Sequence, residues 1–101
     1  MIKNTKAKIS CENGCVKVSG ELNFATVVDL WNESLAYLDK ESELKFDFAG
    51  VTQANSAALA LLLEWVKLAK QRGKSISFYQ LPEQLQSIAK VSGVSQLVVR
   101  L

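Results

Sequence analysis

Residues 47–63 constrain the fold most, because a short strand is expected there to run through a loop into a helix. The helix is expected to begin at Asn55 and Ser56, and its first two turns carry no charge. A helix start presents unpaired backbone N–H groups and the positive end of the helix dipole, so Ser56 lies where a phosphate or a partner's acceptor group would bind. Residues 57–63 are apolar on every side of the helix, which indicates burial on both sides or a surface that a partner covers.

The composition favours one globular domain over residues 1–101. The chain has 101 residues, of which 49% are hydrophobic and 22% charged. The net charge of +2 forms no basic stripe, and the aromatic residues do not alternate with Lys and Arg, so we expect no nucleic-acid binding. No run of 18 apolar residues occurs, and the first eight residues have no apolar core. We therefore expect no signal peptide, no direct membrane insertion and a cytoplasmic location.

A β-hairpin is predicted around the Asn-Gly pair at residues 13–14. A two-residue type I′ turn there places Cys11 opposite Val16, and Ile9 opposite Val18, so that apolar residues pair along the ladder. A three-residue loop would oppose the two cysteines of the chain but would pair an isoleucine with a lysine. The pattern favours the first register.

In this register the two cysteines lie on opposite faces of the hairpin. Cys11 faces inward as a small hydrophobic residue, and Cys15 lies beside Glu12 on the outer side. We therefore predict no disulfide, in keeping with a reducing compartment. The chain has no His and no second cysteine pair, so we expect no metal site.

Helices and strands alternate over the rest of the chain. A helix after Gly20 is predicted to bury a stripe of apolar residues at helical spacing: Phe24, Val27, Val28, Trp31, Leu35 and Leu38. A strand follows in which Leu44, Phe46 and Phe48 alternate with Lys45 and Asp47. The long apolar helix is expected to end at Gly73, with Lys70 and Arg72 at the negative end of its dipole.

Residues 75–79 are predicted to form a further strand. Pro82 then begins a helix with Leu85, Ile88 and Ala89 facing inward; Gly93 ends it, and residues 96–101 form a last strand. Strands separated by single helices require crossover connections, so the later strands should be parallel. We predict an α/β fold with an N-terminal β-hairpin, then β-α-β-α-β-α-β alternation, and a mixed sheet with helices packed on it.

The long helix is predicted to have a sheet-facing side and an unusual outer side. The sheet-facing side contains Leu59, Leu62, Val66 and Ala69, with Ala58, Leu63 and Trp65 on its flanks. The opposite side contains Ala57, Ala60, Leu61, Glu64, Lys67, Leu68 and Gln71. A solvated side would be polar throughout, whereas this one is small and apolar near Ser56 and charged only from Glu64 onward. We predict that Asn55, Ser56, Ala57, Ala60, Leu61 and Glu64 bind a partner.

Two simpler readings of these residues stay open. Exposed apolar residues are common on protein surfaces, and alanine and leucine are good helix formers. Asn55 and Ser56 are also residue types that cap helices without any further role.

With this order of elements, and with a helix that begins Asn-Ser-Ala-Ala-Leu directly after a strand and loop, the chain resembles the STAS domain over nearly all its residues. It looks most like the MlaB-type STAS subunit of the Mla phospholipid-trafficking ABC transporter. Where that subunit has Asp-Thr-Gly-Gly-Leu-Ala-Leu-Leu-Leu, this chain has Asn55-Ser-Ala-Ala-Leu-Ala-Leu-Leu-Leu63. Where its helix ends in Leu-Ala-Lys-Lys-Gln-Gly, this chain has Leu68-Ala-Lys-Gln-Arg-Gly73, and Gly20-Glu21-Leu22 also match.

The resemblance implies a non-catalytic accessory subunit without a cofactor or a small-molecule substrate. Its partner would be the cytoplasmic ATPase of the ABC transporter and, through it, the permease at the inner membrane, in a system that maintains outer-membrane lipid asymmetry. The same fold in anti-sigma factor antagonists implies a different use, in which a partner kinase phosphorylates the serine at the position of Ser56. This chain departs from the antagonists' pattern, with Asn55 in place of Asp and Ala57-Ala58 in place of the Gly that follows the serine.

A third hypothesis is a small enzyme or nucleotide-binding domain. Activation of a serine or cysteine would need a base, and the chain has no His, no nucleophile elbow and no glycine-rich phosphate loop. Lys45 and Asp47 are charged, but outer strand charges are commonly solvated or paired. We therefore predict no catalytic residue.

Overall fold

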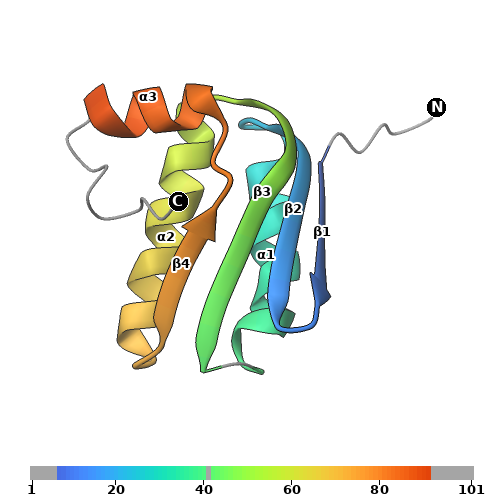
Figure 1. Cartoon of the computed structure of the whole chain (residues 1–101), viewed down its shortest axis with the longest axis vertical. Coiled ribbons are helices and arrows are strands. Elements are labelled where there is room, and N and C mark those ends of the chain that lie inside the picture. Colours follow the sequence, from blue (N-terminus) through green and yellow to red (C-terminus); the bar gives the residue numbers. More distant parts are fainter. Residues whose placement is uncertain (1–6, 41, 92–101) are drawn as a thin grey trace.

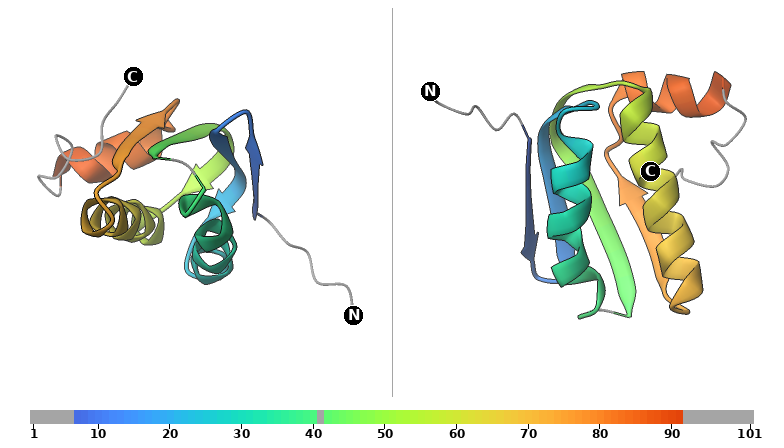
Figure 2. Two further views of the ribbon diagram at one scale, coloured as in Figure 1. Left: turned by 90° about the horizontal axis from the view of Figure 1, so that it is seen from below. Right: turned by 180° about the vertical axis from the view of Figure 1, so that it is seen from behind.

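The computed structural model describes residues 7–40 and 42–91. The elements in chain order are β1 (Ala7–Glu12), β2 (Cys15–Leu22), α1 (Val27–Leu38), β3 (Glu43–Ala54), α2 (Ser56–Gln71), β4 (Ser75–Tyr79) and α3 (Glu83–Val91). The strands form one sheet in the order β1-β2-β3-β4, and α1 and α2 pack side by side on one of its faces (Figures 1 and 2). The α/β fold is therefore confirmed. The predicted last strand, Gly93 and the side chain of Ala89 lie outside the described residues.

The predicted hairpin register is confirmed. Cys11 pairs with Val16, and Ile9 with Val18. The turn residues at positions 13 and 14 have φ of 54° and 78°, as a type I′ turn requires. Both cysteines are free, and Cys11 packs against the core.

The later strands are parallel, as predicted. β2 pairs with β3, and β3 with β4, both in parallel. In β3 the side chains of Leu44, Phe46 and Phe48 are buried, whereas Lys45 is exposed. The loop expected between Phe48 and Asn55 is wrong, because β3 continues to Ala54. Residues 50–54 extend the pairing with β2 through two register shifts, and this pairing replaces the loop.

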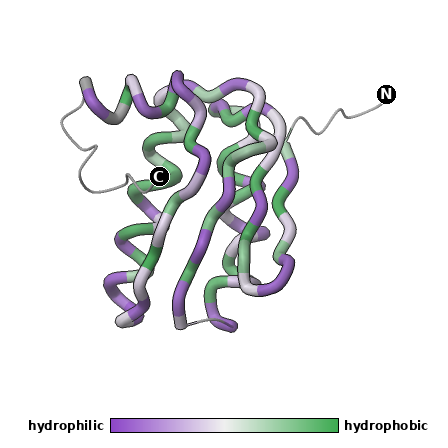
Figure 3. The backbone as a smooth tube through the Cα atoms, in the orientation of Figure 1, coloured by the Kyte–Doolittle hydropathy of each residue, from purple (hydrophilic) through white to green (hydrophobic). Residues whose placement is uncertain are grey.

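The sheet-facing side of α2 is buried as predicted. Leu59, Leu62, Val66 and Ala69 are all buried, and so is the flanking Trp65. The Trp65 ring lies 4.3 Å from the ring of Phe46, measured between centroids, over the middle of the sheet. Hydrophilic positions gather toward the C-terminal end of α2 (Figure 3).

The predicted core stripe of α1 is partly wrong. Phe24 is 75% exposed and Val28 is 63% exposed. The face of α1 that is buried runs through Leu30, Ser34 and Leu38. The helix begins only at Val27, so the position of Phe24 is set by the preceding turn and not by helical periodicity. The polar Ser34 belongs to the buried face, which rotates that face away from Val28.

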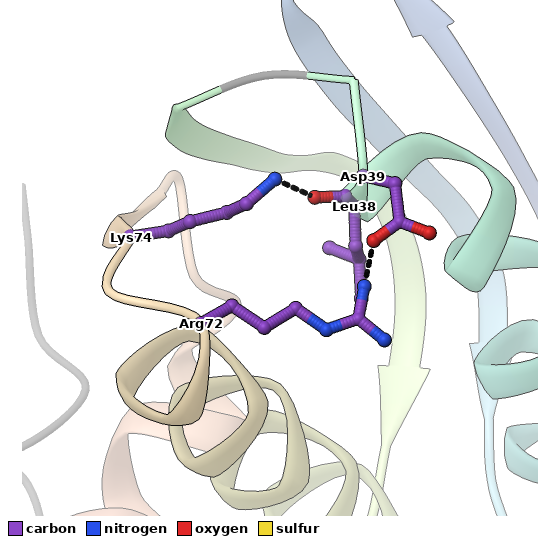
Figure 4. A network of polar contacts seen from close by, with 4 residues as sticks. All are labelled: Leu38, Asp39, Arg72 and Lys74. Carbon is purple, nitrogen blue, oxygen red and sulfur yellow. Dashed lines mark hydrogen bonds and ion pairs between the residues drawn. The ribbon is translucent and has the colours of Figure 1, made fainter.

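Polar contacts hold α1 and α2 together at their C-terminal ends (Figure 4). The ammonium group of Lys74 donates a hydrogen bond to the carbonyl oxygen of Leu38, and Arg72 forms an ion pair with Asp39. The carbonyl of Leu38 is one of the last four in its helix, which lack an intrahelical donor. These contacts fix the spacing of the two helices at the end remote from Ser56.

The third helix lies beside the N-terminal end of α2 (Figure 1). The side-chain oxygen of Gln84 in α3 accepts a hydrogen bond from the backbone N–H of Ala54, at 3.0 Å. Leu85 is buried and Ile88 half-buried, as predicted. Across residues 7–40 and 42–91, no helix has the length and apolar character needed to cross a membrane.

Candidate functional site

The N-terminal end of α2 is capped by Asn55. Its backbone is extended, with φ of −123° and ψ of −166°, and its Oδ1 accepts a hydrogen bond of 2.8 Å from the N–H of Ala57. The N–H of Asn55 donates to the carbonyl oxygen of Leu22 at 3.1 Å, which ties the cap to the end of β2. The sequence left the capping role open between two residues, and the geometry assigns it to Asn55.

Ser56 is the first residue of the helix and is exposed. Its hydroxyl makes no hydrogen bond to any other residue of the described chain. The helix therefore does not need this hydroxyl for capping, and the group is available for contact with a partner.

Two further predicted site residues share the exposed side of α2 with Ser56. Ala60 and Glu64 are both exposed. Positions four and eight residues after Ser56 lie on the same side of a helix and extend about 12 Å along its axis. This stripe presents a hydroxyl, a methyl group and a carboxylate in succession.

The prediction of an outward position is wrong for Ala57 and Leu61. Ala57 is only 2% exposed and Leu61 only 5% exposed. These residues lie on the side of α2 that faces α1, and the packing of the two helices covers them. The apolar character of residues 57–63 on all sides therefore reflects burial by the sheet on one side and by α1 on another.

A groove remains between the two helices, and we call it the α1–α2 groove. Its volume is about 250 Å³, and it is lined by Val27, Val28, Trp31, Ala57, Ala60, Leu61 and Glu64. The buried Ala57 and Leu61 belong to its floor, and the exposed Val28 and Ala60 to its rims. The two helices that form it lie side by side in both views of Figure 2.

The exposure of Val28 on the α1 wall of this groove, and of Phe24 just before α1, was not predicted, because both residues were expected in the core. Phe24 projects from the turn that precedes α1. In this turn the N–H of Asn23 donates to Thr26 Oγ1 at 3.0 Å, and the N–H of Ala25 donates to Asn23 Oδ1 at 2.9 Å. Side chains of Asn and Thr that bond to nearby backbone in this way mark a helix start. These bonds hold the turn that keeps Phe24 at the surface before α1 begins at Val27, and the helical spacing of the apolar residues gave no sign of it.

The groove contains one charged residue and few polar groups that could bind a ligand or take part in a reaction. Six of its lining residues are apolar, and Glu64 is the remaining one. Within the described ranges, no group of three or more Cys, Asp or Glu side chains is placed to hold a metal ion. The arrangement suits contact with an apolar surface.

Cys15 is the one acidic side chain among the described residues whose pKa is raised above its ordinary value. Partial burial raises this pKa, and the nearby carboxylate of Asp47 raises it further. Both residues belong to strands of the sheet, β2 and β3, and neither lines the α1–α2 groove. The shift therefore does not bear on the groove.

Solved structures with the same fold include anti-sigma factor antagonists. The unphosphorylated form of the antagonist SpoIIAA matches with a TM-score of 0.71 and 11% identity, over 92% of this chain and 85% of that one. An antagonist from Mycobacterium paratuberculosis matches with a TM-score of 0.72 and 21% identity, over 91% and 80%. The Bacillus cell fate determinant SpoIIAA in its phosphorylated form matches with a TM-score of 0.67 and 11% identity, over 92% and 88%.

Comparison with the curated proteins finds no match. The family described as "Mlab, STAS domain" matches residues 6–99, nearly the whole chain. The chain belongs to the MlaB-type STAS domain family.

Proposed function

We propose that this chain is a non-catalytic accessory subunit that binds the cytoplasmic ATPase of an ABC transporter for phospholipids and supports the assembly or activity of the complex. The family match supports this role. In this proposal the chain is cytoplasmic and is held at the inner membrane by the ATPase and, through it, the permease. It needs no cofactor and no small-molecule substrate.

The observation that carries the proposal is the exposure of two large apolar side chains near the start of α1: Val28 on a rim of the α1–α2 groove, and Phe24 in the turn that precedes the helix. They are the large hydrophobic side chains that the described chain leaves most exposed, at 75% and 63%. Ala60 is exposed on the opposite rim of the same groove. Complete burial of a large apolar side chain is worth about 1.5–3 kcal/mol, so a partner that covers these residues gains several kcal/mol.

The predicted partner-binding residues divide into two groups in this proposal. Asn55, Ser56, Ala60 and Glu64 are exposed and contact the partner directly. Ala57 and Leu61 act through the floor of the groove, because they are buried between the helices.

The test is co-purification of the chain with a candidate ABC-transporter ATPase from the same organism, using the substitution Ala60→Arg. An arginine at this exposed position is solvated in the free protein, but in the complex its long charged side chain fills the space on the rim of the groove that the partner needs and must lose water, which costs several kcal/mol. We expect Ala60→Arg to abolish co-purification while the free domain keeps its circular dichroism spectrum and thermal stability.

Gln71→Arg is the matched control. Gln71 is exposed on the same side of α2, three turns away, about 16 Å along the helix axis. It should co-purify like the unmodified chain. Unchanged co-purification of Ala60→Arg would contradict the proposal.

A second candidate function is a phosphorylation switch at Ser56. Two observations support it: the exposed Ser56 hydroxyl, which makes no bond within the described residues, and the likeness of the fold to an antagonist whose phosphorylated form has been solved. Incubation with the partner and ATP, followed by intact-mass measurement, separates the two functions. The accessory-subunit proposal predicts no change in mass. A stoichiometric gain of one phosphate, absent from the Ser56→Ala protein, would favour the switch.

A further inference from the structure

We propose that the α1–α2 groove receives an amphipathic helix of the ATPase that places a large apolar side chain over Ala60 and an arginine, about one helical turn away, against Glu64 and Trp31. This inference rests on the proposed function and specifies the chemistry of the partner. The occupant follows from the shape, the apolar lining and the charge of the groove.

The charge of the groove is the first step. Glu64 is the one charged residue among those that line it, and its carboxylate makes no ion pair with any described residue. A carboxylate covered by a partner loses its water, and the complex is weak unless the partner supplies a cation or several N–H donors. The partner segment must therefore carry a positive charge at this point.

The surrounding helices do not supply that cation. α1 contains Asp29 and Glu33 and no Lys or Arg, although the whole chain has a net charge of +2. On α2 the first basic residue is Lys67, which lies beyond Glu64 and does not line the groove. The two helices that form the groove therefore place no Lys or Arg among its lining residues, and this favours a basic partner segment opposite Glu64.

Trp31 selects arginine over lysine. Its half-buried side chain lines the same groove as the Glu64 carboxylate. A guanidinium group pairs with a carboxylate through two parallel hydrogen bonds and also stacks on aromatic rings, whereas an ammonium group acts as a point charge. The groove offers both an aromatic ring and a carboxylate to one side chain.

The small side chain of Ala60 sets where the apolar residue of the partner binds. Ala60 lies one turn before Glu64 on the same side of α2, and the exposed Val28 lies across the groove from it. A helix laid along a groove between two helices presents residues three or four positions apart to the groove, which matches this one-turn spacing. A partner helix with an apolar residue and an arginine at that spacing would contact both Ala60 and the carboxylate of Glu64.

The experiment measures the dissociation constant between the fluorescently labelled full chain and the purified ATPase, at low and at high salt. Glu64→Lys should weaken binding by about 30-fold or more, since it opposes two positive charges. Glu64→Gln, of the same shape, should weaken it less and should reduce its dependence on salt. Glu33→Gln is the control, because it removes an equal charge from the exposed side of α1, outside the groove. It should bind like the unmodified chain.

Charge reversal on the partner completes the test. Replacing the arginine of the ATPase by glutamate should weaken binding to the unmodified chain and restore binding to Glu64→Lys. If both Glu64 variants bind the ATPase as tightly as the unmodified chain while Ala60→Arg still does not bind, the inference is overturned and the proposed function stands. If the unmodified chain does not bind the ATPase, the proposed function itself fails.

Two other occupants of the groove, an anionic lipid surface and a second copy of the chain, are tested directly. Saturable binding to phosphatidylglycerol vesicles that Glu64→Lys strengthens would overturn the helix in favour of an anionic lipid surface. Self-association of the chain alone that Ala60→Arg abolishes, measured by light scattering, would overturn it in favour of a second copy. A chain that stays monomeric and does not bind the vesicles supports the proposed partner helix.

Discussion

Replacement of Ser34 by alanine should destabilise the protein more than any other serine-to-alanine change in its described helices. Ser34 is the one polar residue buried in the core among the described residues. Its hydroxyl accepts a hydrogen bond of 2.8 Å from the indole N–H of Trp65 and donates one of 2.7 Å to the carbonyl oxygen of Trp31. It therefore links the middle of α1 to the middle of α2 beneath the groove.

The expected loss follows from the indole group left behind. Trp65 is fully buried, so its N–H would have no acceptor and no water, which costs about 1–3 kcal/mol. Alanine favours a helix over serine by about 0.5 kcal/mol, which offsets part of this cost. We expect the free energy of unfolding to fall by about 1–2 kcal/mol, or the melting temperature by roughly 5–15 °C for a domain of this size.

Urea unfolding followed by far-ultraviolet circular dichroism measures this loss. The control is Ser87→Ala, since Ser87 is an exposed residue inside α3. It should leave stability unchanged or slightly raise it. In a Trp65→Phe background, which has no indole N–H, Ser34→Ala should cost less by about 1 kcal/mol. Equal stability of the Ser34→Ala and Ser87→Ala proteins would refute this reasoning.

Three further predictions concern the cap, a close contact in the sheet and a thiol. Asn55→Ala should lower the free energy of unfolding by about 1 kcal/mol in thermal denaturation, because the N–H at the start of α2 loses its acceptor. Gly50→Ala should lower it by about 1–3 kcal/mol, because a Cβ there would lie 2.8 Å from the Cβ of Ser19, and adding Ser19→Gly should recover part of the loss. Cys15 should react with iodoacetamide more slowly near pH 8 than a free cysteine, because burial and Asp47 raise its pKa and lower its thiolate fraction; Asp47→Asn should speed the reaction.

The strand and hairpin pairings were predictable because local patterns decide them. The Asn-Gly turn and the apolar alternation around it leave one register that keeps Ile9 opposite Val18. The side of α2 that faces the sheet was predictable for the same reason, since a sheet buries one continuous stripe of a helix.

The groove was only partly predictable because it depends on how two helices pack. Leu61 was expected to face outward, and the sequence does not state that α1 covers that side of α2. Phe24 and Val28 were expected in the core because their spacing is helical, yet the helix begins after Phe24 and buries Ser34 in place of Val28. A polar residue that enters the core through a hydrogen bond to Trp65 is invisible to a pattern of apolar residues.

Hydroxyl-radical footprinting of the free chain and of its complex with the ATPase tests the central claim, that the α1–α2 groove binds the partner, most directly. Phe24, at 75% exposure, should oxidise rapidly in the free protein and slowly in the complex, and Trp31 in the groove should be protected as well. Tyr79 is the internal reference, because it follows the buried Phe78 in β4 and so faces away from α1 and α2. We predict strong protection of Phe24 and Trp31 with Tyr79 unchanged. A stable complex in which Phe24 and Trp31 oxidise as fast as in the free chain would contradict the account.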